Sequence, residues 1–133
     1  MIQLPPALSK RYTQETLAAG EAQRLAEFIA WGPMVFQASR LMVEFGIFAA
    51  LRDSADGMTR AEVAGKTGLS CYAAGCLLEA SLSIGTVLID PESGRFSLSK
   101  AGWFLLNDPA TRVNMRFNHD VCYEGMFRLK ESL

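Results

Sequence analysis

Positive charge is scarce in this sequence of 133 residues, where 13 Lys and Arg face 14 Asp and Glu. The net charge of −1 gives the chain no general attraction to nucleic-acid phosphates or to an anionic membrane. Long apolar runs are missing too, because Arg40, Glu44 and Arg52 interrupt the longest one, so no membrane span is predicted. Residues 1–6 have neither the basic start nor the apolar run of a signal peptide. We therefore expect a cytoplasmic protein.

Cysteine, histidine and glycine are too few or too badly spaced for most functional sites. Three cysteines are an odd number, which fits a reducing compartment better than a set of disulfides. A structural zinc ion needs more ligands than Cys71, Cys76 and the single histidine supply. No two glycines lie two positions apart, so the G-x-G-x-x-G turn of dinucleotide-binding proteins is absent, as is the Walker A loop. We predict no catalytic, cofactor-binding or metal-binding residues in this chain.

Apolar spacing predicts two helices in the first part of the sequence. Residues 1–12 show no periodicity and are predicted as an arm that is ordered only when something holds it. A first helix is predicted from Thr13 to about Trp31. Pro33 then suits the first turn of a second helix, predicted to run to about Leu51.

The second predicted helix is apolar around most of its circumference, because its large side chains do not fall on one stripe. It is either the central helix of a monomeric core or a helix that a second copy of the chain helps to cover. We favour the homodimer, since one small core covers only part of such a helix. The predicted interface residues are Leu25, Phe28, Trp31, Met34, Phe36, Met42, Phe45 and Phe48.

The middle of the sequence predicts a winged helix-turn-helix. Thr59 and Glu62 have the spacing of a capping box that opens a short helix. Ser70 caps the next helix, which extends to about Ile84. Residues 86–98 then follow the pattern of strand, four-residue turn and strand, which is a β-hairpin wing. The expected fold is mainly α: a winged helix-turn-helix with a small β-hairpin wing and additional N- and C-terminal helices.

Three segments are predicted from this organisation. Residues 1–31 form an N-terminal arm and dimerisation helix, and residues 32–106 form the winged-helix domain. Residues 107–133 are a further helical segment, with Asp108 as its cap and Pro109 in its first turn. Its apolar face continues to the last residue, so we expect this segment to lead into a longer protein.

A winged-helix transcriptional regulator that binds DNA is the alternative interpretation. The helix that would enter the major groove, Ser70 to Ile84, contains no Lys, Arg, Asn or Gln, and its one charge is Glu79. Base recognition and phosphate binding both depend on those residue types. The wing sets Arg95 against Asp90 and Glu92. Nucleic acid is therefore not the partner that we expect.

Polar and titratable side chains gather inside one apolar helical segment, residues 118–124. They are a modest candidate for lining a ligand pocket, although helix capping and solvent exposure explain them equally well. His119 and Cys122 are three apart and can share a helical face, but a packed cysteine beside a surface histidine is the commoner arrangement.

Four segments taken together resemble the N-terminal dimerisation domain of S-adenosylmethionine (SAM)-dependent O-methyltransferase-like proteins. They are Met42–Leu51, Met58–Leu69, Leu77–Leu88 and Arg95–Leu106. The resemblance covers residues 32–106, and it implies a winged-helix domain that dimerises through its N-terminal helices. It also implies a separate Rossmann-like catalytic domain that binds SAM and transfers the methyl group. Residues 107–133 are then expected to be the helical linker toward that domain, which this chain does not contain.

The resemblance further implies that the helix after the wing contributes to the acceptor pocket, which here points to Met115, His119 and Tyr123. The family's glycine-rich SAM loop is absent from this sequence. The chain alone is thus expected to be no enzyme and to hold no cofactor. SAM and a small-molecule acceptor are expected for the full-length parent.

Overall fold

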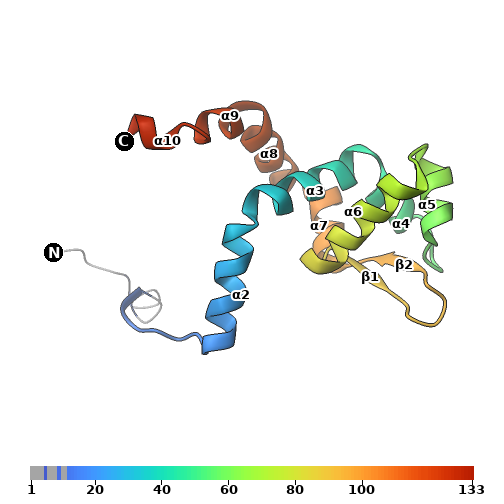
Figure 1. The fold of residues 1–133 in the computed structure, drawn as a ribbon, viewed down its shortest axis with the longest axis horizontal. Helices are drawn as coiled ribbons and strands as arrows, with labels where there is room; N and C mark the ends of the chain where they lie inside the picture. Colours follow the sequence, from blue (N-terminus) through green and yellow to red (C-terminus); the bar gives the residue numbers. More distant parts are fainter. Residues whose placement is uncertain (1–4, 6–8, 10–11) are drawn as a thin grey trace. The chain divides into compact units, whose positions relative to one another are not determined.

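A computed structural model describes residue 5, residue 9 and residues 12–133 of the chain. It divides into two units, residues 1–33 and residues 34–133, and each is described by itself. The arm predicted over residues 1–12 lies almost wholly outside the described residues. Figure 1 shows the course of the chain.

Helix α2 of the first unit spans Ala19–Ala30 and begins later than Thr13. Residues 15–18 are not helical, because carboxylates bond to their backbone: Leu17 N donates to Glu15 and Ala18 N donates to Glu21, at 2.7 and 2.8 Å. Such local bonds compete with helical ones. The predicted end of the helix is confirmed, since Trp31 is its C-cap. None of the residues of α2 is buried.

The predicted helix from Pro33 to Leu51 is two helices, α3 (Gly32–Glu44) and α4 (Ile47–Arg52). The break falls at Gly46, whose φ of 74° lies in the left-handed region that glycine adopts without strain. The backbone N–H of Gly46 donates to the carbonyl of Val43 and closes α3. The turn gives α4 its own direction, so four of its six residues are buried.

The winged helix-turn-helix is confirmed. It consists of α5 (Arg60–Thr67), α6 (Cys71–Ile84) and an antiparallel pair of strands, β1 (Val87–Ile89) and β2 (Phe96–Leu98). The capping box is present, with Thr59 N donating to Glu62 at 2.7 Å and Glu62 N donating to Thr59 at 3.3 Å. Ser70 caps α6 by accepting from Ala73 N.

The chain after the wing is helical, as predicted. It forms α7 (Lys100–Asn107), α8 (Pro109–Phe117), a π-helical turn (Asn118–Cys122), α9 (Tyr123–Met126) and α10 (Leu129–Ser132). Asp108 caps α8 by accepting from the backbone N–H of Thr111 at 2.7 Å. No helix among the described residues is both long enough and apolar enough to cross a membrane.

One apolar core joins α3 and α4 to the helix-turn-helix and the wing. Its buried residues are Met42, Ile47, Phe48, Leu51, Val63, Ala64, Ala74, Leu78, Val87 and Phe96. Met42 and Phe48 are 0% exposed within the single chain, so a partner cannot contact their side chains. We therefore remove Met42 and Phe48 from the predicted dimer interface.

Glu62 connects the helix-turn-helix to the wing, because its carboxylate also pairs with Arg95 at 2.9 Å. The backbone N–H of Thr59, followed by Arg95, holds the pKa of Glu62 below its ordinary value of 4.5. A lowered pKa contributes stability above the ordinary value, and this stability is lost as pH falls through the folded value. We expect Glu62→Gln to be less stable than wild type at neutral pH, with a difference that shrinks once both are acidified. Urea unfolding across a pH series tests this, and a difference independent of pH would contradict it.

Candidate functional site

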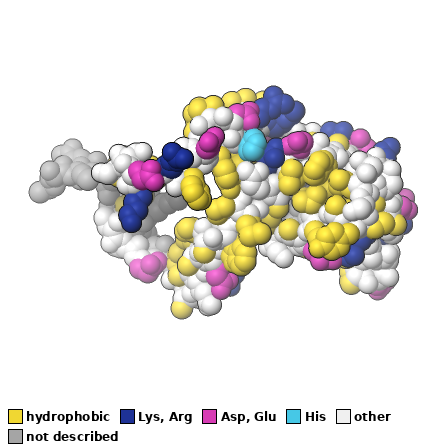
Figure 2. All heavy atoms as spheres, turned by 45° about the horizontal axis from the view of Figure 1, so that its top comes forward, with side chains coloured by type: hydrophobic (Ala, Val, Ile, Leu, Met, Phe, Trp, Pro, Cys, Tyr) yellow, Lys and Arg dark blue, Asp and Glu magenta, His cyan; other side chains and the backbone are white. Residues whose placement is uncertain are grey.

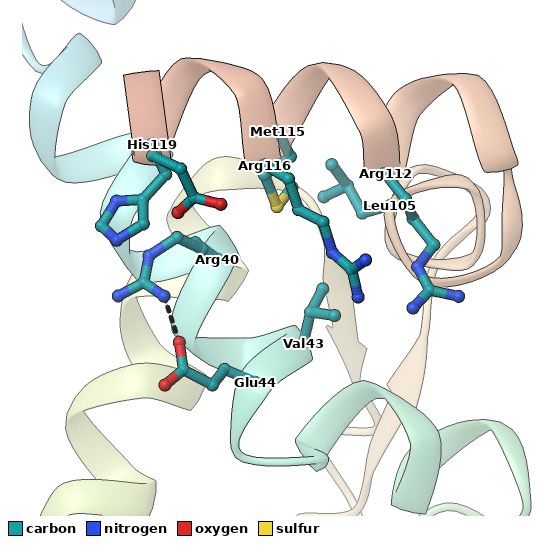
Figure 3. A pocket seen from close by; sticks show the side chains of 9 residues that line it. Arg40, Val43, Glu44, Leu105, Arg112, Met115, Arg116 and His119 are labelled. Carbon is teal, nitrogen blue, oxygen red and sulfur yellow. Dashed lines mark hydrogen bonds and ion pairs between the residues drawn. The ribbon is translucent and has the colours of Figure 1, made fainter. Parts of the chain in front are cut away.

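The helices after the wing enclose a hollow of about 260 Å³ together with the second half of α3 (Figure 3). All of its lining residues belong to the second unit. They are Arg40, Val43 and Glu44 from α3, Leu105 from α7, Arg112, Met115 and Arg116 from α8, and His119 and Asp120 from the π-helical turn.

Helical spacing puts the α8 residues on one face. Arg112 and Arg116 are four residues apart, as are Met115 and His119, and residues three or four apart are neighbours on a helix surface. The π-helical turn then begins at Asn118, immediately before His119. Single π-helical turns inside α-helices are rare and occur frequently at functional sites.

His119 is half-buried at the edge of the hollow. The side-chain amide nitrogen of Gln37 lies 3.4 Å from Nδ1 of His119 and donates to it when the imidazole proton is on Nε2. The ring of Tyr123 is 6.5 Å from the imidazole and stacks on Phe36 at 5.5 Å. Figure 2 shows this one histidine at the surface, beside basic and acidic side chains.

The three arginines that line the hollow differ in their side-chain contacts. Arg40 donates to the side-chain oxygen of Gln37 at 3.0 Å and pairs with Glu44. The guanidinium groups of Arg112 and Arg116 make no hydrogen bond or ion pair with any residue that the structure describes. Figure 3 shows both of their guanidinium groups extending from α8 toward the end of α3, where Val43 lies.

The structure brings two of the three predicted pocket residues together, because Met115 and His119 both line the hollow. Tyr123 lies beside His119 but does not line it. The sequence interpretation missed Arg40, Arg112 and Arg116. The four-residue spacing between Arg112 and Arg116, in register with Met115 and His119, is the signal that points to them.

Six interface candidates keep accessible surface. Leu25, Phe28 and Trp31 are 49%, 53% and 60% exposed, and Met34 and Phe45 are exposed too. Phe36 is half-buried against Tyr123.

Two arginines of the helix-turn-helix and the wing, Arg60 and Arg95, are paired with nearby carboxylates. Arg60 pairs with Glu79 at 2.7 Å, and Arg95 pairs with Glu62 at 2.9 Å. The strength of DNA binding comes mostly from cations that are free to meet phosphates. Among the described residues, no three His, Cys, Asp or Glu side chains gather closely enough to hold a metal ion.

These features define a winged-helix domain with helical extensions and a hollow, lined by both apolar and charged side chains, beneath its C-terminal helices. The family model of the Dimerisation2-like domain matches residues 23–96, and the chain belongs to that family. No curated protein sequence is similar enough to count as a relative.

Solved structures share the fold. LepI in complex with SAM has a TM-score of 0.72 at 18% identity, over 94% of this chain and 31% of LepI. Human N-acetylserotonin methyltransferase in complex with SAM has a TM-score of 0.67 at 20% identity, and the match covers 86% of this chain and 35% of that enzyme. The SAM-dependent methyltransferase SibL has a TM-score of 0.68 at 19% identity, and the match covers 79% of this chain and 31% of SibL. The chain therefore spans about a third of the length of the structures that it resembles.

Proposed function

We propose that the chain is the dimerisation and substrate-covering module of a SAM-dependent methyltransferase-like protein, and that it is not catalytic in isolation. Membership of the Dimerisation2-like family and the likeness to the SAM-bound structures of LepI and human N-acetylserotonin methyltransferase support this role. The partners proposed are a second copy of the chain and, through the parent's catalytic domain, SAM and a small-molecule acceptor.

The exposure of the apolar face of α2 is the main support for the proposed pairing of two copies. This helix has 12 residues and none of them is buried, although Leu25, Phe28 and Ile29 form one apolar face at i, i+3 and i+4. Isolated helices of this length are marginal in water, so tertiary packing must supply most of their stability. Covering each large side chain contributes about 1.5–3 kcal/mol. A two-fold pair buries the same face on both copies.

The hollow supports the substrate-covering part of the proposal. Met115 supplies an apolar contact, and the side-chain amide of Gln37 lies within hydrogen-bond distance of the imidazole of His119. Tyr123 backs the imidazole from the next turn. Such a mixture of an apolar wall with a few placed polar groups is typical of small-molecule sites.

We also propose a cytoplasmic location. Cys71, Cys76 and Cys122 are all unpaired, and the first two are exposed. Free, exposed thiols persist in a reducing compartment.

The isolated chain should show no measurable affinity for SAM. The sequence has no glycine-rich turn, and the described residues contain no parallel strand-helix-strand unit to position one. Isothermal titration calorimetry tests this, with a full-length SAM-dependent methyltransferase as the positive control. Saturable binding at micromolar SAM with one site per chain would contradict the proposal that SAM binds to the parent's catalytic domain and not to this chain.

A further inference from the structure

We propose that the hollow between α3, α7 and α8 binds the carboxylate of a small molecule with an apolar body, through the guanidinium groups of Arg112 and Arg116. This inference rests on the proposed function, because it names the chemical class of the acceptor that the module covers.

The two guanidinium groups are the first argument. Arg112 and Arg116 lie one turn apart on α8, and like charges at that spacing disfavour a helix. Neither guanidinium group has an ion pair or hydrogen bond within the described part of the chain. Both extend into the same hollow (Figure 3). A planar guanidinium matches a carboxylate through two parallel N–H···O bonds, so an anion seated here removes the repulsion.

The carboxylates of the hollow leave this end cationic. Three arginines line it against two acidic residues, Glu44 and Asp120. Glu44 is engaged by Arg40, which also bonds to Gln37. Asp120, on the π-helical turn with His119, comes four residues after Arg116, but the two side chains form no ion pair in the described part of the chain. The positive charge is thus concentrated at the Arg112 end.

The other walls indicate the rest of the ligand. Val43, Leu105 and Met115 give the hollow an apolar surface beside the arginines. A free inorganic anion makes no use of that surface, whereas an aromatic or aliphatic carboxylate buries its body against it. The volume of about 260 Å³ admits a molecule of one or two rings.

NMR titration of the full chain with benzoate tests the proposal, using the imidazole signals of the single histidine and the backbone amides of α8. Benzamide is the neutral analogue of the same shape, and inorganic phosphate is the anion without an apolar body. We expect saturable benzoate shifts at His119 and α8 that weaken as salt rises. Benzamide and phosphate should each bind about tenfold more weakly or worse.

Variants assign the site. Arg112→Gln and Arg116→Gln should each weaken benzoate binding by about threefold to tenfold. Arg128→Gln, an exposed arginine that does not line the hollow, should leave it unchanged. Equal binding of benzoate and benzamide, tighter binding of phosphate, unchanged binding by the Arg112→Gln/Arg116→Gln double variant, or no saturable benzoate shift would each overturn the inference. The proposed pairing of two chains is tested separately. A monomeric mass in light scattering would contradict the pairing, even if benzoate still binds.

Discussion

Replacing Phe28 by Asp should turn the paired chain into separate monomers. Phe28 is about half exposed on α2, a helix with no buried residue, and we place it inside the two-fold interface. Burying a polar group without a partner costs about 2–7 kcal/mol, and each pair contains the substitution twice. The dimer dissociation constant should therefore rise about a thousandfold or more. Sedimentation velocity over a concentration series measures the change.

Tyr72→Asp is the matched control for Phe28→Asp. Tyr72 is also an aromatic residue on a helix, is 83% exposed, and lies on α6, away from every interface candidate in the sequence. Its substitution should leave the dissociation constant within a few-fold of wild type. A Phe28→Asp variant that sediments like wild type would show that α2 makes no contact between copies.

Gly102→Ala should destabilise the fold by about 1–3 kcal/mol or more. Gly102 is buried in α7, where an added methyl group would overlap the backbone oxygen of Thr86 and lie 2.6 Å from a methyl carbon of Leu98. A backbone atom cannot move aside as a side chain can, so α7 must shift away from the wing. Because α7 also supplies Leu105 to the hollow, the shift should disturb the site.

Gly65→Ala separates this steric effect from helix propensity. Gly65 is exposed inside α5, and a methyl group there meets nothing within 4 Å. Alanine should therefore stabilise this helix by up to about 1 kcal/mol. Urea unfolding of both variants measures the two free energies. A Gly102→Ala variant as stable as Gly65→Ala would contradict the close contact between α7 and the wing.

Local signals explain why much of the fold is predictable from the sequence. The Thr59–Glu62 capping box, the Ser70 cap and the Asp108–Pro109 start each depend on hydrogen bonds within a few residues. Adjacent side chains and backbone decide such bonds, so the sequence shows them directly.

The break between α3 and α4 was not predictable in the same way. Apolar residues stand on both sides of Gly46, and periodicity continues across it. A helical wheel drawn through one axis places Phe45 and Phe48 on the same face, because they are three residues apart. The structure has two axes, which turn Phe48 into the core and leave Phe45 exposed.

The candidate site was predictable only in part. The family resemblance pointed to Met115 and His119, and both line the hollow. Arg40 reaches the hollow from α3. It precedes the α8 residues of the lining by more than 70 positions in the chain, so only tertiary packing places it beside them. The π-helical turn has no sequence signature that separates it from α-helix.

The mass of the unmodified chain in solution tests the central claim most directly. Multi-angle light scattering at low micromolar concentration, with circular dichroism to show that the protein is folded, gives that mass without any substitution. Pairing through α2 predicts twice the mass of a single chain. A folded species with the mass of one chain would contradict the account, because the apolar face of α2 would then be stable without a partner.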